Sequence, residues 1–452
     1  MDLRESVEQR FARIGLMLER KCFSEAKEHL SAMEPADIAE GLEELSSTQM
    51  VLYFRLLPKD LAIEVFEVMR WDEQQRLIEH VTDKEVGEII EDMSDDDRTV
   101  LLDELPAKTV KKLLLQLSPE ERQLANRLLN YTEGSAGRVM TPEFIDLKKG
   151  MTAEEAVGRI RSVARKKETI YTCFVIDDAR HLQGVVELED LIMAGSKTEV
   201  ESIMDDEPVY VNTTTDQEEV ARVMSRYDLH TIPVVDKENR LVGIVTFDDV
   251  LDILEEEATE DFERMAGIQP VEDSYLDVNI LTMARKRFMW LVICIITEAF
   301  TSTVLKHYSQ TIQTVVALTY FIPLLIGTGG NAGTQAATLM IRGMTVGDIT
   351  RKDIGKILLR ETASGLLLGG ALAVLGFARA MVLDTGFDVA MVLTFAVVSV
   401  VLMGNLAGAI LPLIARALKM DPAIMSGPFI TTIVDVFGLI VYFEIARMVL
   451  KT

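Results

Sequence analysis

Cysteine is scarce in this chain, and the few cysteines lie far apart. Cys22, Cys173 and Cys294 form no C-x-x-C pair. A disulfide framework and a zinc site of ordinary cysteine spacing therefore have no support in the sequence. So few cysteines fit a protein of the reducing cytoplasm.

Signals for export and for catalysis are also missing. The N-terminal segment MDLRESVEQRFARIG is charged throughout and lacks the apolar stretch of a secretory signal. The sequence has no Walker loop, nucleophile elbow or metal-hydrolase spacing. We therefore expect the chain up to about residue 280 to stay in the cytoplasm, and we do not expect an enzyme.

Basic residues are few in the larger, N-terminal part of the chain. Residues 1–284 hold 63 acids and 32 bases, a net charge of −31, whereas residues 285–452 hold 9 acids and 14 bases, a net charge of +5. A part this acidic repels phosphate backbones, so we expect no nucleic-acid partner. Cations are better partners for it. The alternative is that the acids only solvate a helical surface.

Long apolar runs fill the C-terminal part, separated by short charged connectors. About 20 apolar residues are needed to cross ~30 Å of hydrocarbon as a helix. Buried helices of soluble proteins rarely stay uncharged over such lengths. The sequence predicts five membrane spans, at residues 289–305, 314–341, 363–383, 389–415 and 423–450.

The short connectors predict the orientation of these spans. Arg and Lys are frequent before the first span, between the second and third, and between the fourth and fifth, and rare in the other connectors. Basic loops stay inside, so we expect a cytoplasmic N-terminus and, after an odd number of spans, a C-terminus outside. This predicts a multi-pass protein of the cell (inner) membrane, surrounded by the lipid bilayer.

Two acids fall in the middle of predicted spans. Asp435 lies in PFITTIVDVFGLIVYF and Glu298 in LVICIITEAFTSTVL. A charge at mid-bilayer costs at least ~2.5 kcal/mol, so such acids are candidates for function. For Asp435 the alternative is a structural carboxylate bonded to Thr431 or Thr432. We predict that Asp435 binds an ion in a pore, with Glu298 as a second candidate.

The second span contains GTGGNAGTQ, residues 327–335, which is unusual for a helix that faces lipid. We expect irregular backbone there, with carbonyls free to meet a cation or its water shell, and Asn331 as a candidate pore ligand. Close helix packing through small residues is the alternative. Pro323, Pro412 and Pro428 are expected to bend helices. Such a polar pore suits Mg2+, which keeps much of its water.

Residues 138–197 and 200–260 form an internal repeat. The segment Gly184-Val-Val-x-x-x-Asp190 of the first copy returns as Gly243-Ile-Val-x-x-x-Asp249 in the second. Each copy predicts strand, helix, strand, strand and helix. The arrangement resembles a tandem CBS pair, a regulatory module that senses ligands and is not catalytic.

Many CBS modules bind adenine nucleotides through Gly, two apolar residues, Ser or Thr, and an Asp three residues later that holds ribose hydroxyls. The second copy meets this pattern with Gly243, Thr246 and Asp249, whereas the first has Glu187 in place of Ser or Thr. The resemblance implies at most one good nucleotide site, with ATP as a candidate ligand.

Residues 1–130 predict short amphipathic helices, because apolar residues recur three and four apart and prolines separate the segments. We expect an all-helical superhelix. Asp92 and the run Asp95-Asp96-Asp97 gather around one helix start, where capping of the helix dipole is the alternative to metal binding.

The segment that follows the repeat, DDVLDILEEEATEDFE, is rich in acids and has no base. Like charges three and four residues apart on a helix are unfavourable by ~0.2 to 0.5 kcal/mol per pair. Bound cations would therefore stabilise this segment as a helix.

The whole chain resembles the MgtE magnesium transporters, with GTGGNAGTQ, VTFDDVLDILEEEATED and TTIVDVFGLIVYF as long matches. The resemblance implies a multidomain fold: an all-α N-terminal superhelix, an α+β tandem CBS pair and a five-helix transmembrane domain. The implied boundaries are 1–132 (N domain), 133–198 and 199–252 (CBS repeats), 253–284 (acidic connecting, or plug, helix) and 285–452 (membrane domain).

The resemblance also implies a homodimeric, Mg2+-selective channel or transporter for magnesium uptake. Its pore would lie on the dimer axis, with Asp435 binding hydrated Mg2+ near the narrowest point. Cytoplasmic Mg2+ would bridge the N domain, the CBS pair and the plug helix and close the pore. The positions that match these cytoplasmic sites are Asp92, Asp96, Asp216, Glu218, Asp228, Asp249, Asp252, Glu257, Glu260 and Asp261.

Two other functions fit the same residues. An ion-coupled divalent cation exchanger would use Glu298 and Asp435 alternately to carry the coupling ion. A membrane-anchored CBS nucleotide sensor would transport nothing.

Overall fold

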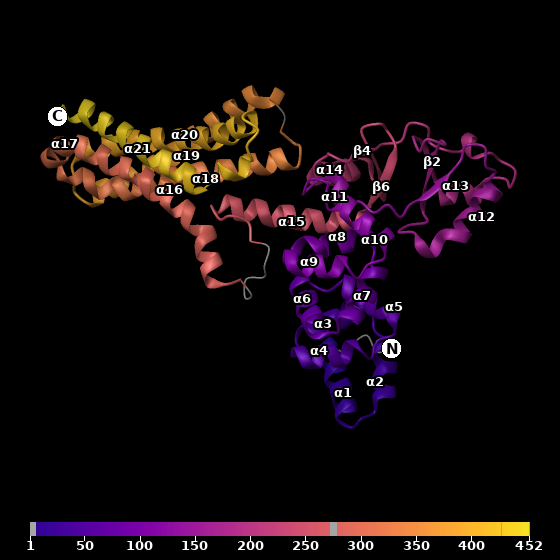
Figure 1. Ribbon diagram of the computed structural model, residues 1–452. Helices are drawn as coiled ribbons and strands as arrows, with labels where there is room; N and C mark the ends of the chain where they lie inside the picture. The colour runs from indigo at the N-terminus through magenta and orange to yellow at the C-terminus, as the bar shows by residue number, and fades with distance from the viewer. Residues whose placement is uncertain (1–5, 272–277, 350, 426, 452) are drawn as a thin grey trace. The chain divides into compact units, whose positions relative to one another are not determined.

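The computed structural model describes residues 6–271, 278–349, 351–425 and 427–451, without the side chains of residues 83, 104 and 351 (Figure 1). The chain forms two compact units, residues 1–254 and 255–452. The boundary falls inside one long helix, α15 (Phe247–Met265).

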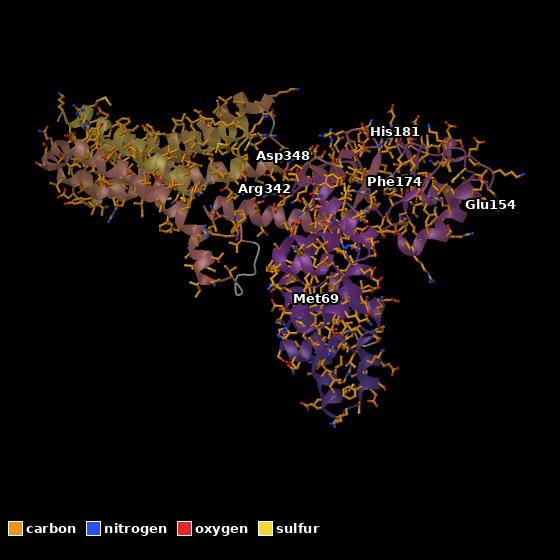
Figure 2. The ribbon with its side chains drawn as sticks, viewed as in Figure 1. Met69, Glu154, Phe174, His181, Arg342 and Asp348 are labelled. Atoms are coloured by element: carbon orange, nitrogen blue, oxygen red, sulfur yellow. The ribbon has the colours of Figure 1, made fainter. Side chains whose placement is uncertain are left out.

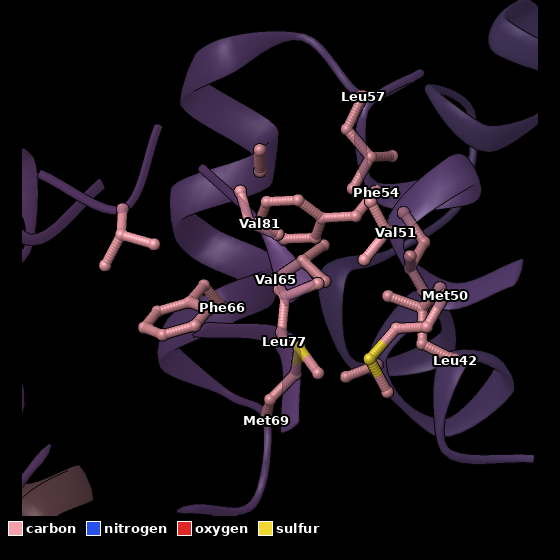
Figure 3. Close-up of a cluster of buried hydrophobic side chains, with 14 of the residues drawn as sticks. Leu42, Met50, Val51, Phe54, Leu57, Val65, Phe66, Met69, Leu77 and Val81 are labelled. Atoms are coloured by element: carbon pink, nitrogen blue, oxygen red, sulfur yellow. The ribbon is translucent and has the colours of Figure 1, made fainter. Parts of the chain in front are cut away.

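The first unit begins with short helices joined by tight connections. Several begin with a capping residue, as where Thr82 and Glu85 form a capping box at α7. Their apolar faces share one core in which the rings of Phe11 and Tyr53 stack 5.5 Å apart, and Figure 3 shows the part of this core around Phe54 and Phe66. This confirms the all-helical prediction. The helices are α1 (Val7–Glu19), α2 (Phe23–Leu30), α3 (Pro35–Glu43), α4 (Ser47–Phe54), α5 (Lys59–Glu67), α6 (Trp71–His80), α7 (Asp83–Asp92), α8 (Asp95–Glu104), α9 (Ala107–Leu114) and α10 (Pro119–Leu128).

Two copies of a βαββ unit follow, each with a three-stranded sheet. In each copy the first two strands are parallel and the last two antiparallel. Thr172 pairs with Glu187 in the first copy, and Thr231 with Thr246 in the second, so the predicted repeat extends to the register. Figure 2 marks Phe174 in the first sheet and Glu154 on the helix beside it. The elements are α11 (Ala136–Val139), β1 (Ile145–Leu147), α12 (Ala153–Val163), β2 (Thr172–Ile176), β3 (Leu182–Glu187), α13 (Leu188–Met193), β4 (Val211–Asn212), α14 (Gln217–Tyr227), β5 (Thr231–Val235), β6 (Leu241–Thr246) and α15.

Five helices of the second unit are long and apolar enough to cross a membrane, counted within the described residues. Helix α20 packs against α18, α19 and α21, whereas α16 packs mainly against α21. The hydroxyl of Tyr442 donates to the carbonyl of Leu318 at 2.9 Å and so ties α21 to the turn before α18. The elements are α16 (Ile280–His307), α17 (Ser309–Thr314), α18 (Ile322–Thr345), α19 (Ile354–Val382), α20 (Phe387–Ala417) and α21 (Gly427–Leu450), with 3-10 turns at Val316–Phe321, Arg351–Asp353 and Pro422–Ile424.

The expectation of irregular backbone at residues 327–335 is wrong, because α18 is helical throughout this stretch. Its glycines allow close packing instead. A Cβ on Gly408 would lie 2.2 Å from the carbonyl oxygen of Gly333, and one on Gly404 would lie 2.5 Å from that of Gly329. The backbones of α18 and α20 therefore approach each other as small residues permit in membranes.

The prolines also act differently from the expectation. Pro323 stands at the first positions of α18, where a proline costs no hydrogen bond, and Pro428 stands at the start of α21. Only Pro412, among the three, lies inside a helix. Its position in α20 fits the predicted bend.

Gly408→Ala should destabilise the membrane unit by roughly 1 to 3 kcal/mol, because the added methyl group meets a backbone carbonyl that cannot move away alone. Gly370→Ala is the matched control, since nothing lies within 4 Å of a Cβ at this exposed position of α19. Thermal unfolding of the purified protein in detergent should show a lower midpoint for Gly408→Ala only. Equal midpoints would contradict the close packing of α18 and α20.

Candidate functional site

Asp435 is a buried carboxylate in the middle of α21. Its side chain is 7% exposed, and its Oδ1 atom is buried without a hydrogen-bond partner among the described residues. The structural alternative fails, because the hydroxyls of Thr431 and Thr432 donate to the carbonyl of Pro428, at 2.9 and 2.8 Å. A buried carboxylate oxygen without a partner is costly unless a cation or a proton compensates it.

The other two predicted pore residues lie on exposed faces of the bundle. Glu298, on α16, is exposed but near enough to Asp435 for the two carboxylates to repel each other. Asn331 is exposed on α18. The single chain therefore brings Glu298 toward Asp435.

The first unit brings together four carboxylates that we call the acidic cluster: Asp96 and Asp97 at the start of α8, and Asp248 and Asp249 at the start of α15. Asp96 is 5% exposed, and its Oδ1 atom has no partner in the described part of the chain. Asp96 interacts electrostatically with Asp249, and Asp97 with Asp248. Asp249 accepts hydrogen bonds from the backbone N–H and hydroxyl of Thr246, at 3.2 and 2.5 Å.

Burial and mutual repulsion shift the pKa values in this region upward. Burial is the main cause for Asp96, whose pKa is raised well above its usual range, with the charge of Asp249 as the next cause. Burial also raises the pKa of Asp249 to about 7. Loss of hydration, reinforced by Asp96 and Asp248, raises the pKa of Glu168 to about 8, although its side chain stays partly open to solvent. The negative charges of these carboxylates are therefore not balanced by positive groups nearby, among the residues that the structure describes.

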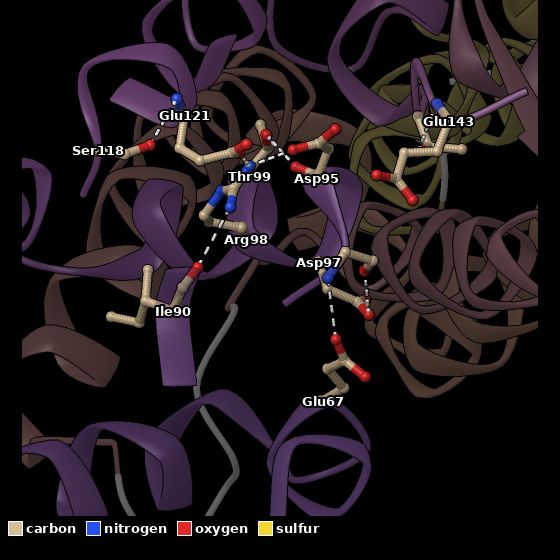
Figure 4. A network of polar contacts seen from close by, with 11 residues as sticks. Glu67, Ile90, Asp95, Asp97, Arg98, Thr99, Ser118, Glu121 and Glu143 are labelled. Atoms are coloured by element: carbon tan, nitrogen blue, oxygen red, sulfur yellow. Dashed lines mark hydrogen bonds and ion pairs between the residues drawn. The ribbon is translucent and has the colours of Figure 1, made fainter. Parts of the chain in front are cut away.

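Arg98 stabilises the start of α8 through Asp95, Glu121 and the backbone of Ile90 (Figure 4). Its side chain is 1% exposed, pairs with Asp95, donates to Glu121 at 2.7 Å and donates to the carbonyl of Ile90 at 3.2 Å. Asp97 is held in turn by the hydroxyl of Ser94, at 2.7 Å. Arg98 thus compensates Asp95 and leaves the charges of the acidic cluster unpaired.

Of the predicted cytoplasmic ligands only Asp96 and Asp249 belong to the acidic cluster, and four of the others lie at helix ends or in local ion pairs. Asp92 pairs with Lys59, and Glu218 pairs with Arg222 at 2.9 Å. Asp216 caps α14 by accepting from the N–H of Glu218 at 3.0 Å. Asp228 ends α14 in a left-handed conformation, with φ of 53°. Helix capping and local ion pairs therefore occupy the side chains of Asp92, Asp216 and Glu218 in the structure.

The second half of α15 belongs to the second unit and carries Glu257, Glu260 and Asp261. Arg264 pairs both with Glu260, one turn earlier, and with Asp421 in the connector between α20 and α21. Asp261 lies near the hydroxyl of Thr345, at 3.4 Å. This end of α15 is therefore tied to the membrane unit through Arg264. Of the predicted acids not yet placed, Asp252 in the first unit interacts electrostatically with Asp97.

The tentative nucleotide residues lie close together at the end of β6. A Cβ on Gly243 would lie 2.9 Å from the carbonyl oxygen of Thr141, so only glycine fits this contact. Thr246 and Asp249 bond to each other, and Asp249 also belongs to the acidic cluster. A ligand of this pattern would compete with cations for Asp249.

No group of three or more Asp, Glu, His or Cys side chains converges closely enough to hold a metal ion, within the described residues. The acidic cluster is thus a region of concentrated charge whose carboxylates need further approach to coordinate an ion.

Several residues of this region were missed by the sequence predictions. Asp97 and Asp248 adjoin predicted ligands in acidic runs, and the runs themselves were the signal. Glu168 had no such signal, because tertiary packing alone brings it to the cluster. Arg98 directly follows Asp97, but the sequence gives no sign of which acid it pairs with. Asp421 also gave none beyond its place before Pro422.

Comparison with known proteins follows the same division of the chain. A family described as divalent cation transporter, MgtE, matches residues 322–445; the MgtE intracellular N domain matches residues 33–134; and CBS domains match residues 136–197 and 200–256. The magnesium transporter MgtE of Thermus thermophilus is 39% identical over 430 residues, which cover 94% of this chain and 95% of that protein. The chain belongs to the MgtE family. The MgtE of Bacillus subtilis is 29% identical over 434 residues, covering 96% of both chains.

Two solved structures resemble about half of this MgtE family member. The cytosolic domain of the Mg2+ channel MgtE in complex with ATP has 39% identity and a TM-score of 0.52, and it covers 54% of this chain and 99% of that one. The soluble part of a magnesium transporter has 28% identity and a TM-score of 0.53, and it covers 56% and 100%. The MgtE relatives are transporters, so the expectation that the chain is not an enzyme is confirmed, as are the CBS pair and the multidomain fold.

Proposed function

We propose that this protein is a Mg2+ channel for magnesium uptake and that cytoplasmic Mg2+ closes it. The observation that carries the proposal is Asp435, a buried carboxylate without a partner inside an apolar helix bundle. A divalent cation that keeps part of its water shell is the natural counter-charge for such a group. Asp435 would bind Mg2+ during permeation, and polar groups on α18, Asn331 among them, would contact its water.

A homodimer completes the pore in this proposal. Only 6% of the apolar window of α16 is buried within one chain, and Glu298 lies exposed on this helix. A carboxylate facing lipid is unfavourable by at least ~2.5 kcal/mol, so a second copy of the chain is a better neighbour for that face. The N-terminus would lie in the cytoplasm and the C-terminus outside, in the cell membrane, as the basic connectors predict.

The acidic cluster supports the proposed gate. Asp96 and Asp97 come from the N-terminal helices, while Asp248 and Asp249 begin α15, so a bound cation would link the two elements. Without Mg2+ these carboxylates repel one another and favour separation. With Mg2+ they approach, and α15, which continues to Met265 and ends at the Arg264–Asp421 ion pair, would carry the change to the membrane unit.

ATP is a second proposed ligand, at Gly243, Thr246 and Asp249. The solved cytosolic domain of an MgtE channel holds ATP, and this chain keeps the residue pattern in its second CBS repeat. Because Asp249 would serve both ligands, ATP is expected to change the Mg2+ concentration at which the gate closes.

Flux into liposomes separates the proposed channel from its two rivals. Purified protein should carry Mg2+ into vesicles down its gradient, at a rate that does not change when a pH or Na+ gradient is imposed. Dependence on either gradient would favour the ion-coupled exchanger. No flux from a folded, correctly inserted protein would leave the membrane-anchored nucleotide sensor.

Binding of Mg2+ by the cytoplasmic part should weaken as pH falls. The raised pKa values mean that Asp249 and Glu168 hold more protons in the folded protein than in the unfolded chain, between the ordinary carboxylate pKa of about 4 and the shifted values of about 7 and about 8. The contribution of these groups to stability is therefore present at low pH and is lost as pH rises through the shifted values. Mg2+ replaces those protons, so its stabilising effect should be larger at about pH 8 than at about pH 5.5.

Limited proteolysis of the full-length protein measures this effect. In chelator, cleavage within and after α15 should be faster at the higher pH, and roughly 10 mM Mg2+, above weak oxygen-site dissociation constants of ~1 mM, should slow it mainly there. Asp96→Asn with Asp249→Asn should reduce both dependences, whereas Asp178→Asn, at a fully exposed acid, should leave them unchanged. Equal cleavage with and without Mg2+ at both pH values would remove the basis of the proposed sensor.

A further inference from the structure

The membrane unit has a polar pocket at one end of the helix bundle, lined by residues that the proposed pore and gate do not use. Its volume is about 730 Å³. It lies where α16 ends, where the short helix α17 follows, and where α21 ends, and Figure 1 shows α17 beside the C-terminus of the chain. The pocket therefore lies at the ends of the apolar helices α16 and α21, where a bilayer changes from hydrocarbon to headgroups.

Basic and neutral donor groups line this pocket. Arg447 in the last turn of α21 and Lys451 just beyond its end both line the pocket. His307 adds a third nitrogen-bearing side chain, and the amides of Gln310 and Gln313 add neutral donors. No Asp or Glu is among the described residues that line the pocket.

One acid stands at the edge of the pocket and takes only part of its donor capacity. Glu444 accepts from the hydroxyl of Tyr308 at 2.6 Å and from one guanidinium nitrogen of Arg447 at 3.1 Å. A guanidinium has five N–H donors in a fork, so Arg447 keeps donors for a second oxyanion. The bond to Glu444 also fixes the orientation of the Arg447 guanidinium.

One hydroxyl group adds to the donors of the pocket. Thr311 lines the pocket and is 6% exposed. Its side chain can donate one O–H to an acceptor bound there.

The charge of this pocket is unusual for its position. The connectors at this end of the bundle are poor in Arg and Lys, yet Arg447 and Lys451 meet in one cavity there. A cation pathway gains nothing from basic side chains beside it, since they repel the ion. An anionic ligand is the simpler reason for them.

We propose that this pocket binds the phosphate group of an anionic membrane lipid. Arg447 and Lys451 would hold the phosphate oxygens, with Thr311 and the glutamine amides as further donors. Exposed apolar side chains continue from the pocket along the bundle, Met448 on α21 and Val316 after α17, and would accommodate the acyl chains. Free phosphate would use the donors without needing this apolar surface, so the lipid is the better fit. The inference rests on membrane insertion and on neither the ion nor the gate.

Native mass spectrometry of the full-length protein in detergent tests the proposal. Phosphatidylglycerol should bind more tightly than phosphatidylcholine with the same acyl chains. Arg447→Gln with Lys451→Gln should weaken the binding of phosphatidylglycerol by about tenfold or more, because each basic residue contributes to attraction of an anionic headgroup. Lys352→Gln with Lys356→Gln, which removes the same charge from exposed sites just before α19 and in its first turn, should change it less than twofold by the same reasoning.

Three outcomes would overturn the proposal: equal binding of the two lipids, unchanged binding of phosphatidylglycerol by the first variant, or equal losses in both variants. Inorganic phosphate at millimolar concentration should not displace the lipid; displacement would assign the pocket to a soluble phosphate instead. Should the double variant fail to fold, Lys451→Gln alone, at an exposed residue just beyond α21, gives the same test with an expected loss of roughly threefold.

Discussion

Asp435→Asn is expected to abolish Mg2+ uptake while leaving the protein folded. The substitution keeps the size of the side chain and part of its hydrogen bonding. It removes the negative charge of the buried carboxylate, which would bind the ion. A partly dehydrated divalent cation would then meet no counter-charge at this depth, which costs several kcal/mol and therefore at least about a hundredfold in flux.

The control for this variant is Asp388→Asn, which removes an exposed carboxylate from the first turn of α20. It should transport Mg2+ at nearly the wild-type rate. Both proteins are compared as liposome flux per folded protein, with thermal unfolding as the check on folding. Wild-type flux through folded Asp435→Asn protein would remove Asp435 from the pore.

Neutralising the acidic cluster should give a channel that no longer closes. Closing a gate from 99:1 open to 99:1 closed requires ~5.5 kcal/mol of differential binding, which is more than a single weak carboxylate site supplies. Each single substitution should therefore shift the Mg2+ concentration for closure only modestly. The combined change of Asp96, Asp97, Asp248 and Asp249 to Asn should remove closure.

The sign of the combined effect depends on two opposing contributions. Removing the negative charges relieves the repulsion that keeps α8 and α15 apart, and this favours closure. It also removes the ligands through which Mg2+ would link the two helices. We expect the second contribution to dominate, because Asn is a weaker ligand than a carboxylate for a hard cation. Neutralising the exposed acids Glu154, Asp178 and Glu238 together should leave closure unchanged.

Much of this fold could be predicted from the sequence because it depends on periodicity. The helices of the first unit follow from apolar residues three and four apart, and the repeat follows from strand patterns that recur in the same register. The five membrane helices were found, but α16 at Ile280 and α19 at Ile354 begin well before the predicted spans. Arg285 and Lys356 lie in these added segments, and a hydropathy pattern excludes them although the helix continues beyond the apolar core.

The candidate sites were less accessible from the sequence, because proximity there is a tertiary property. The runs around Asp96 and Asp249 identified two acidic helix starts, and only the folded chain shows that they face each other. Arg98 has no distinguishing pattern in the sequence, yet it determines which acid of the run Asp95-Asp96-Asp97 is paired. The glycines of residues 327–335 were ambiguous for a related reason, since both a broken helix and a closely packed helix require small side chains.

The most direct test of the proposed channel and gate is a recording from inside-out membrane patches that contain the full-length protein. Mg2+ is raised on the cytoplasmic face from near zero to roughly 10 mM, above the ~1 mM dissociation constants of weak oxygen sites. Wild-type channels should close as Mg2+ rises, and channels with the four Asn substitutions in the acidic cluster should stay open over the same range. Closure of both proteins at the same Mg2+ concentration would contradict the account.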